Sequence, residues 1–509
     1  MRRRTFLGAL AASATLPALA AADSTTTPGR LSPGFVVDTP GLHEVATGPD
    51  GRYAYGAADD ALVVVDCDAV DAPEVAARVE ATMDGTAMTG LADVVVDGDR
   101  VLVAGPPGFV DGGQPAGAAV FDVSDPANPE QTATVPTDHA VHNAALAGDT
   151  AYLTGYMLAD QPLVAYDVSG DDAAELFRWS VTDERPDWSA LNRSLYQVHD
   201  VTVRGDHAYV SYWDAGTWIL DVSDRENPEP VTQMGGVDPE TYGDLGQEEQ
   251  FDELGQLPGN AHSTALSPDG SVLALGREAG DRDPGDDRYG GPGAIELYDV
   301  GDLADPTFLT ALRPPVVEDT DGERSVATAH NFAFRGDRLY AAWYSSGVRA
   351  YDVADPEQPV DLGGWAAPGE ASFWGAAPLD EGFVGASYHD PSAPDDENRD
   401  SQNAKLYTFP EQAADDAPDA RTMAVNATGV PEDPPAFDFR AEQRTTTSAG
   451  TTADGQTGTS TRSSTTGGTD GTGASSGAST GESGGSVPGF GALVAAAGAS
   501  LAALHRLRY

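Results

Sequence analysis

The feature that most constrains how this chain can fold is an internal repeat, which occupies about residues 31–410. Each copy contains three short alternating or β-branched runs separated by tight Gly-Asp-type turns, and a fourth run that follows a proline-containing turn. The copies cover residues 41–66, 90–123, 142–168, 199–222, 262–300, 330–353 and, in a degenerate form, 373–407. Four strands in each of seven units predict an all-β fold, a seven-bladed β-propeller of four-stranded blades.

The ends of the repeat region indicate how the ring closes. The seventh unit has no clear fourth strand after residues 406–410, whereas residues 35–40 form a strand-like run that precedes the first unit and belongs to none. Pairing these two segments would complete the last blade and cover its edge. The competing segment, 436–439, follows acidic, proline-rich sequence. We therefore expect an N-terminal strand to complete the last blade.

The third run of each unit is apolar and is followed by aspartate. It reads Leu-Val-Val-Val-Asp at 62–66, Trp-Ile-Leu-Asp-Val-Ser-Asp at 218–224 and Val-Arg-Ala-Tyr-Asp-Val-Ala-Asp-Pro at 348–356. These residues resemble the LVIVD repeat family, and the resemblance extends over about residues 31–410. It implies a surface or secreted β-propeller of halophilic archaea. It implies little chemistry, because most members of the family have no established activity.

The charge balance limits the partners of the protein. The chain has 81 acidic and 28 basic side chains, a formal net charge of −53, and Lys405 is its only lysine. Nucleic acid is excluded as a main partner, because its phosphates are bound by clustered basic residues. An anionic membrane surface is disfavoured for the same reason. The acidic excess is typical of a halophilic globular protein that works in concentrated salt.

The N-terminus predicts export. Residues 1–22 have the layout of a signal peptide, with arginines, an apolar run and small residues at the end. The pair Arg3 and Arg4 before Thr-Phe-Leu resembles the twin-arginine (Tat) type, whose machinery exports folded cargo. Cys67 is the only cysteine, so an intramolecular disulfide and a cysteine-based metal site are excluded.

The C-terminus predicts attachment to the cell surface. An acidic, proline-rich linker at 411–443 precedes a disordered Ser/Thr/Gly-rich stalk at 444–486. Residues 487–509 contain Pro488, Gly489 and Phe490, an apolar run and two arginines. This layout resembles the PGF-type sorting signals of archaea, in which an archaeosortase removes the tail and a lipid anchor replaces it.

We expect a protein anchored at its C-terminus on the extracellular cell surface, or a secreted one if the tail is released. The alternative, a plain C-terminal membrane anchor, gives the same location. Two sequons, at Asn192 and Asn426, are glycosylation candidates for a glycoprotein.

The long insertions predict which face of the propeller binds. Turns between first and second strands are tight, whereas long loops join second to third strands and one unit to the next. Both loop classes emerge on one face, here called the top face, and we expect binding there. The long loops are 105–117, 183–196, 235–260, 277–293, 313–329 and 389–403.

Histidines mark the start of the innermost strand in five of the seven units. Because the innermost strands line the central channel, these imidazoles are predicted to form a ring near its top entrance that could hold Cu or Zn. The alternative is that the histidine is an inherited consensus residue with a structural role. Ala92 and the pair Phe373-Trp374 interrupt the ring. The candidate ligands are His43, His142, His199, His262 and His330.

Two acidic features have weaker functional interpretations. An aspartate ends the third strand of six units, beside the turn to the fourth strand, and we expect it to cap that turn. The acidic loop at 281–287 has oxygen ligands suited to Ca²⁺, but its spacing matches no EF-hand and solvated surface is the alternative. The sequence contains no nucleophile motif or phosphate-binding glycine loop, so no catalytic residue is predicted.

Two functions therefore remain open. The first is a non-catalytic propeller, displayed on the cell surface, whose top face binds a protein, glycan or envelope partner of unknown identity. The alternative is an exported metal-binding oxidoreductase of the copper type, which would use the histidine ring.

Overall fold

The computed structural model describes residues 31–108, 114–170, 172–281, 288–315, 328–389, 403–411 and 417–432. The export signal, the stalk and the sorting signal at residues 487–509 lie outside the described residues, and so does most of the acidic loop at 281–287. Within the described ranges, no helix has the length and apolar character needed to span a membrane.

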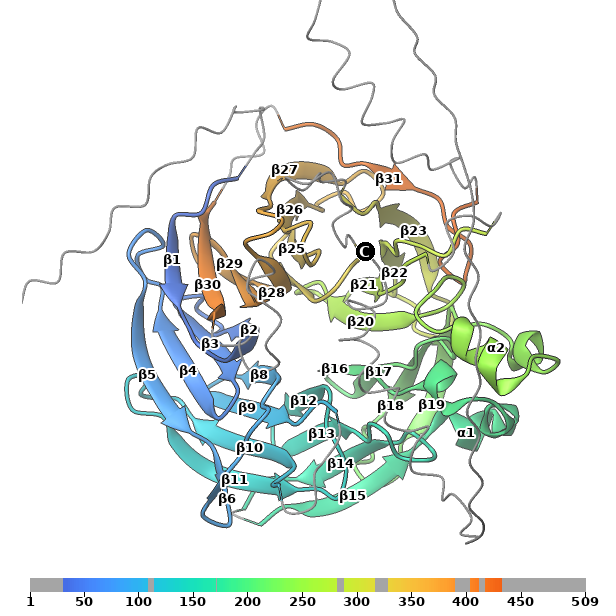
Figure 1. Ribbon diagram of the computed structural model, residues 1–509, viewed down its shortest axis with the longest axis horizontal. Helices are drawn as coiled ribbons and strands as arrows, with labels where there is room; N and C mark the ends of the chain where they lie inside the picture. Colours follow the sequence, from blue (N-terminus) through green and yellow to red (C-terminus); the bar gives the residue numbers. More distant parts are fainter. Residues whose placement is uncertain are drawn as a thin grey trace, which may run out of the picture.

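Seven antiparallel four-stranded sheets are arranged in a ring around a central axis, which confirms the predicted β-propeller (Figure 1). From the axis outward, blade 1 consists of β2 (Leu42–Thr47), β3 (Tyr53–Ala58), β4 (Ala61–Asp66) and β5 (Glu74–Glu80). Blade 2 consists of β8 (Asp93–Asp97), β9 (Arg100–Gly105), β10 (Gly117–Asp122) and β11 (Glu130–Pro136). Blade 3 consists of β12 (Ala144–Ala147), β13 (Thr150–Thr154), β14 (Leu163–Asp167) and β15 (Ala174–Trp179).

The remaining blades repeat the same order. Blade 4 consists of β16 (Asp200–Arg204), β17 (His207–Ser211), β18 (Thr217–Asp221) and β19 (Glu229–Met234). Blade 5 consists of β20 (Ala261–Leu266), β21 (Val272–Arg277), β22 (Ile295–Asp299) and β23 (Thr307–Leu312). Blade 6 consists of β24 (Phe332–Arg335), β25 (Arg338–Ala342), β26 (Val348–Asp352) and β27 (Val360–Trp365). Blade 7 consists of β28 (Ser372–Leu379), β29 (Gly382–His389), β30 (Lys405–Pro410) and β1 (Phe35–Asp38).

The ring closes as predicted, because the outermost strand of blade 7 comes from the N-terminal end of the described chain. Strand β1 pairs antiparallel with β30, with Phe35 opposite Thr408 and Val37 opposite Leu406. Figure 1 shows the two strands side by side although they are far apart in the sequence. This pairing links the first and last blades and leaves β30 with a partner on both sides.

The apolar run of the third strand is continuous because both of its faces are buried. In β4, Leu62 and Val64 pack with Val103 of blade 2, whereas Val63 and Val65 pack with Leu406 of blade 7. Alternate residues of a strand point to opposite faces, so one run supplies two inter-blade cores. Burying each such side chain stabilises the fold by about 1.5–3 kcal/mol.

The aspartate after each third strand is structural, as predicted. In all six units its Oδ1 atom accepts a hydrogen bond from the backbone N–H two residues further on, at the start of the turn to the fourth strand. The side chain therefore replaces a backbone partner that the turn lacks. The six residues are Asp66, Asp122, Asp167, Asp221, Asp299 and Asp352.

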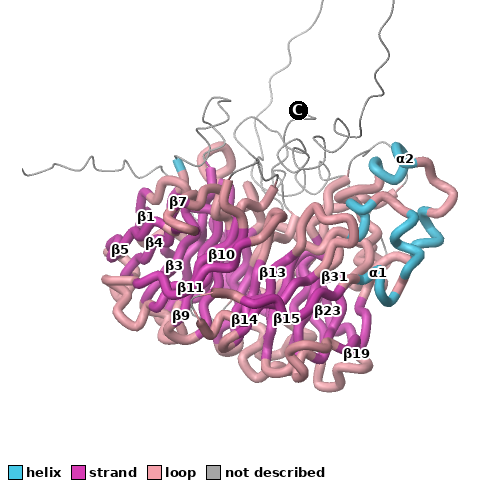
Figure 2. Tube along the Cα trace, turned by 90° about the horizontal axis from the view of Figure 1, so that it is seen from below, coloured by secondary structure: helices cyan, strands magenta, loops and turns pink. Residues whose placement is uncertain are grey.

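Short helices and two small strands lie in the connections between blades. The helical elements occupy two insertions, between blades 3 and 4 and between blades 4 and 5, on one side of the molecule (Figures 1 and 2). They are α1 (Val181–Glu184), η1 (Pro186–Ala190), η2 (Arg193–Tyr196), η3 (Pro239–Tyr242) and α2 (Gln247–Asp252). A small hairpin joins blades 1 and 2 and consists of β6 (Thr82–Met83) and β7 (Thr86–Ala87).

Part of the segment that was expected to be a linker, 411–443, packs on the propeller. Strand β31 (Thr422–Met423) pairs with β23 as a fifth strand of blade 5, and Asp419 forms a bridge with Val360 of blade 6. The Gly259 N–H donates to the Thr428 carbonyl, 2.9 Å away. Residues 417–432 therefore extend the folded body beyond the last blade.

Candidate functional site

Four of the five predicted histidines lie side by side at the top of the innermost strands, and we call them the histidine layer. They come from consecutive blades, and each ring contacts the next. The ring centroids are 4.3 Å apart for His142 and His199, 4.1 Å for His199 and His262, and 4.6 Å for His262 and His330. All four side chains are buried. The repeat produces this arrangement because each histidine occupies nearly the same place in its blade.

The fifth histidine, His43, does not join this series. Trp374 of blade 7 stands next to His330, with ring centroids 4.3 Å apart, and His43 lies beyond it, 6.4 Å from the tryptophan ring. The prediction that all five imidazoles form one ring therefore needs correction. The bulky indole separates the first blade from the histidines of blades 3 to 6, and Ala92 of blade 2 offers no ring.

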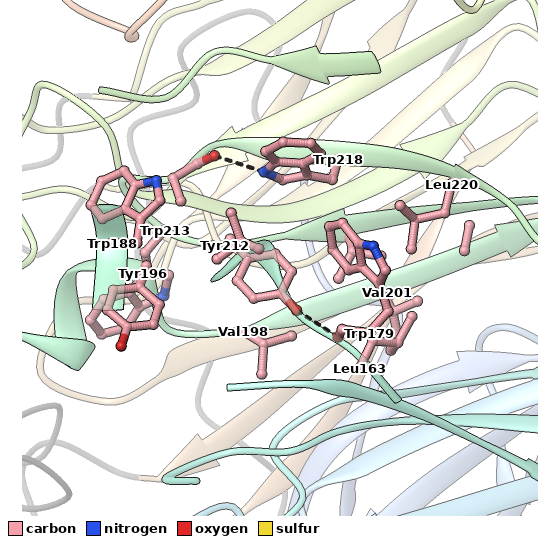
Figure 3. Close-up of a cluster of buried hydrophobic side chains, with 14 of the residues drawn as sticks. Leu163, Trp179, Trp188, Tyr196, Val198, Val201, Tyr212, Trp213, Trp218 and Leu220 are labelled. Carbon is pink, nitrogen blue, oxygen red and sulfur yellow. Dashed lines mark hydrogen bonds between the residues drawn. The ribbon is translucent and has the colours of Figure 1, made fainter. Parts of the chain in front are cut away.

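An aromatic side chain supports each of three of these histidines. Within two residues of the end of the second strand, Tyr156 stacks on His142 at 4.9 Å, Trp213 stacks on His199 at 5.8 Å, and Tyr344 meets His330 edge-on at 4.7 Å. Figure 3 shows Trp213 within a larger cluster that includes Trp188 and Tyr212. The aromatic contacts hold the imidazoles in place without engaging their nitrogens in hydrogen bonds.

Blade 5 has a carboxylate, Glu278, where its neighbours have an aromatic residue. Glu278 directly follows β21 and is buried. Its Oε2 atom lies 3.0 Å from Nε2 of His262, and the Tyr344 hydroxyl donates to its Oε1 atom. Glu278 was not among the residues predicted from the sequence. An alignment of the blades with one another could have found it, because Glu278 is acidic at a position where blades 3, 4 and 6 have Tyr or Trp.

Three of these residues form a group with the donors of a metal site. One nitrogen each of His199 and His262 and one carboxylate oxygen of Glu278 all lie within 4.8 Å of one another. Neither ring nitrogen of His199 has a hydrogen-bond partner among the described residues. For His262, Nδ1 has no hydrogen-bond partner among the described residues, whereas Nε2 pairs with Glu278 Oε2.

Burial controls the protonation of the histidine layer. It lowers the pKa of His142 to about 4 and of His330 to about 3, and it lowers the pKa of His199 well below the usual value. These three imidazoles are therefore neutral near pH 7. Burial opposes ionisation of Glu278, but the adjacent His262 outweighs it and lowers the pKa of the carboxyl to about 2.

Backbone carbonyls set the tautomers of the two outer histidines. Nδ1 of His142 lies 3.1 Å from the Pro107 carbonyl, and Nδ1 of His330 contacts the Trp374 carbonyl. A carbonyl only accepts, so in the neutral ring Nδ1 carries the proton and Nε2 has a free lone pair. Both rings therefore present an acceptor nitrogen of the kind that metal ions bind.

A second layer lies one residue further along the innermost strands. We call Glu44, Asp93 and Asp200 the carboxylate layer. All three are buried, and burial raises the pKa of each: to about 7 for Asp93, well above the usual value for Glu44, and also upward for Asp200. Their side chains line the top of the central channel.

The carboxylates connect different blades by hydrogen bonds. Asp93 Oδ2 accepts from the Ala144 N–H at 2.6 Å, and Asp200 Oδ2 accepts from the Thr264 N–H at 3.0 Å. Glu44 Oε2 accepts from Asn331 of blade 6 at 2.6 Å. That contact crosses blade 7 at Gly375, where a Cβ atom would lie 2.0 Å from Glu44 Oε1. These bonds assign the layer a structural role in closing the ring.

Below the carboxylate layer the channel is a cavity of about 600 Å³. Its lining residues come mostly from the innermost strands, and they include Pro49, Pro268 and Gly336 of the hairpin turns on the face opposite the top. The cavity therefore runs from the carboxylate layer to the bottom face.

Other predicted sites are placed as follows. Asn192 is half-buried, and its side chain caps η2 by accepting from the Ser194 N–H at 3.1 Å. Asn426 is exposed on the segment after the last blade. Arg3, Arg4, Pro488, Gly489 and Phe490 lie outside the described residues.

Comparison with protein families gives a match within the repeat region. Residues 197–233, which include all of blade 4 but its last residue, match the model of the LVIVD repeat. The match covers one blade, and the other blades share its four-stranded pattern. A search of curated proteins found no match.

Among solved structures, the β-propeller domain of Cps50 (Swd1) from Myceliophteria thermophila has a TM-score of 0.51 and 10% sequence identity, covering 75% of this chain and 100% of that chain. A functionally unknown protein from Desulfotomaculum acetoxidans has a TM-score of 0.40 and 12% identity, covering 62% and 83% of the two chains. The first likeness supports the propeller fold and nothing further, and the second carries no argument.

Proposed function

We propose that this LVIVD-repeat propeller is a non-catalytic binding protein, exported and anchored at the cell surface, whose top face binds a protein, glycan or envelope partner. The observation that carries the proposal is the unequal construction of the two faces. Hairpin turns on the bottom face are as short as two residues, as between Ala147 and Thr150 or Arg204 and His207. The insertions of 181–196 and 236–260 instead fold into helical turns.

The side chains of these insertions are suited to a solvated surface that can bind a partner. Their buried side chains, Trp188, Leu195, Tyr196 and Tyr242, join the core of blades 3 and 4. Their exposed side chains are predominantly acidic. The exposed acidic residues are Asp183, Glu184, Asp187, Asp238, Glu240, Asp244, Glu248, Glu249 and Asp252, and Glu253 is half-buried. A fixed backbone loses little entropy on binding, and the acidic surface selects partners with cationic groups.

The proposed location rests on sequence signals. The Tat-type signal with Arg3 and Arg4 would direct the folded chain to its export machinery, and the segment with Pro488, Gly489 and Phe490 would be processed by an archaeosortase that leaves a lipid anchor. Membrane contact would then occur through the anchor alone. The net charge of −53 suits an exterior rich in salt.

The test combines location and binding. Cells that express the full chain should expose it to added protease, and replacing both Arg3 and Arg4 with Lys should abolish this exposure. The purified chain should bind the cell envelope fraction in high salt, and replacing 238–256 with a short Gly-Ser loop should weaken binding at least tenfold. A control in which exposed Asp99 and Asp206 of the bottom-face turns become Asn should bind as the natural chain does. Equal binding by the loop variant would overturn the proposal.

A second candidate function, an exported oxidoreductase of the copper type, is favoured by one observation, the series of contacting imidazoles in the histidine layer. When bound there, copper would supply one-electron chemistry. The test is dioxygen uptake by the copper-loaded full chain with an added electron donor. Uptake no faster than that of the same copper bound to a short histidine peptide would exclude this candidate.

A further inference from the structure

We propose that His199, His262 and Glu278 form a binding site for one divalent ion of the Zn²⁺ or Cu²⁺ class, with His142 and His330 flanking it. The proposal concerns ion binding alone. It holds for a redox-inert ion, and the copper-type oxidoreductase considered above would require it.

The spacing of the donor atoms is close to that of a coordination sphere. Donors bound at about 2.1 Å to a tetrahedral ion lie about 3.4 Å apart. His262 Nε2 and Glu278 Oε2 are already 3.0 Å apart, and the nitrogen of His199 completes a group within 4.8 Å. Side-chain rotations that move the His199 nitrogen inward by about 1–2 Å would complete the sphere.

The buried nitrogens are a second, independent indication of a ligand. His199 and His262 are 1% and 0% exposed. Neither ring nitrogen of His199 nor Nδ1 of His262 makes a hydrogen bond within the described part of the chain, and Nε2 of His262 pairs with Glu278. An unsatisfied buried polar group destabilises the fold, and native structures rarely leave several together. An ion that accepts one lone pair from each ring would remove part of this cost.

The surroundings orient the donors as the outer partners of metal sites do. The Tyr344 hydroxyl donates to Glu278 Oε1 and so directs the other carboxylate oxygen toward His262. Trp213 stacks on His199 and limits its rotation. Such outer contacts are typical of protein metal sites, where they fix ligand orientation.

The donor set selects the class of ion. Two imidazoles and one carboxylate suit Zn²⁺, Cu²⁺ or Co²⁺, whereas Ca²⁺ and Mg²⁺ prefer sites built from oxygen. Three protein donors leave a fourth position, which His142 or His330 can fill with Nε2 or a small ligand can occupy. The neighbouring rings are 4.3 Å from His199 and 4.6 Å from His262, centroid to centroid.

The experiment measures metal uptake by the full chain. The protein is stripped with chelator, equilibrated separately with Zn²⁺, Co²⁺ and Cu²⁺ in high salt, and analysed for bound metal by mass spectrometry. Affinity is measured by competition with a chromophoric chelator, and Co²⁺ absorption reports the geometry. We expect one equivalent of ion and the intense visible bands of four- or five-coordinate Co²⁺.

Variants locate the site. His199→Phe keeps a ring against Trp213 and removes both nitrogens, and Glu278→Gln keeps an acceptor for Tyr344 and removes the charge; each should weaken binding at least tenfold. Tyr344→Phe, which removes only the group that positions Glu278, should weaken binding severalfold and alter the Co²⁺ spectrum. His207→Phe, at the bottom end of the same sheet as His199, should leave binding within twofold.

Three outcomes would overturn the site: no stoichiometric uptake by the natural chain, uptake that His199→Phe and Tyr344→Phe both leave unchanged, or an equal loss in His207→Phe. Stoichiometric binding without dioxygen uptake would sustain the metal site and exclude only the oxidoreductase.

Discussion

The histidine layer and the carboxylate layer occupy adjacent positions on the innermost strands, yet they differ in whether their polar atoms have hydrogen-bond partners. The carboxylates of Asp93 and Asp200 accept backbone hydrogen bonds from the next blade at 2.6 and 3.0 Å. The ring nitrogens of His199 and Nδ1 of His262 have no hydrogen bond within the described residues. On the same innermost strand, the carboxylate residue therefore joins two blades, whereas the histidine next to it remains available to a ligand.

The comparison of the two layers also distinguishes residues that stabilise the fold from residues that are available for binding. Satisfied buried acceptors contribute to the stability of the ring, whereas unsatisfied buried nitrogens lower it. A buried polar group without a hydrogen-bond partner lowers the stability of the fold. It is therefore a better candidate for ligand binding than a buried polar group whose hydrogen bonds are complete. Substitutions in the two layers should therefore have different consequences.

The largest effect is expected from the carboxylate layer. Asp200→Ala removes the acceptor of the Thr264 N–H and of the Asn143 amide, and leaving both donors unsatisfied should lower the free energy of unfolding by about 2–4 kcal/mol. Urea unfolding followed by tryptophan fluorescence, at constant salt, measures this. Asp200→Asn keeps one acceptor oxygen and should lose about half as much. A loss below about 0.5 kcal/mol for Asp200→Ala would remove the structural role of the layer.

The next effect is a dependence on pH. The pKa of Asp93 is raised to about 7 by burial and by nearby Asp200, so between about pH 4 and 7 the folded chain binds a proton that the unfolded chain has lost. The contribution of Asp93 to stability is therefore complete below about pH 4 and is lost as the pH rises to about 7. The slope is at most about 1.4 kcal/mol per pH unit.

Asp93→Asn removes this titration and keeps an acceptor for the Ala144 N–H. The stability of the variant relative to the natural chain should rise between about pH 5 and 7.5. The difference between the two chains is the quantity to measure, because His142 and His330, whose pKa values are lowered by burial, act in the opposite direction. A difference that does not change with pH would show that Asp93 does not titrate in this range.

A smaller effect is expected from the histidine layer without metal. His199→Phe removes two unsatisfied nitrogens while it keeps a ring against Trp213, so the metal-free variant should unfold within about 1 kcal/mol of the natural chain. Added Zn²⁺ should stabilise the natural chain and not the variant. Thermal unfolding with and without the ion measures both. A metal-free loss as large as that of Asp200→Ala would erase the distinction between the layers.

The smallest effect is expected from the repeated aspartate on the bottom face. Asp221→Ala removes the acceptor of the Ser223 N–H, which is exposed and can bind water instead, so the loss should be about 0.5–1 kcal/mol. Urea unfolding compares this change with Asp200→Ala. A loss equal to that of the buried aspartate would show that burial does not distinguish them.

Much of the fold followed from local sequence patterns. The alternating runs and turn residues of each unit predict four strands, and the unassigned run at 35–40 predicts the closing strand β1. These features depend on residues near each other in the chain, or on the simple count of strands per unit. The aspartate caps followed in the same way, because each contacts a backbone group two residues away.

The site was less accessible from the sequence. The register of the repeat identified five candidate histidines. The position of Trp374 between His330 and His43, however, depends on how blade 7 packs. Glu278 and Tyr344 are 66 residues apart and belong to different blades. Their contact follows from the closed ring, and nothing in the local pattern of either blade encodes it.

The sequence alone determined the number of blades, the strand that closes the ring and the register that carries the histidines, because a repeat enforces the same local geometry in every copy. Only the tertiary structure decided that four imidazoles form a continuous series, that Glu278 joins two of them, and that 417–432 pack on blades 5 and 6. The reason is physical. Periodicity specifies which residues share a position, whereas burial and contact between side chains from different copies exist only once the ring has closed.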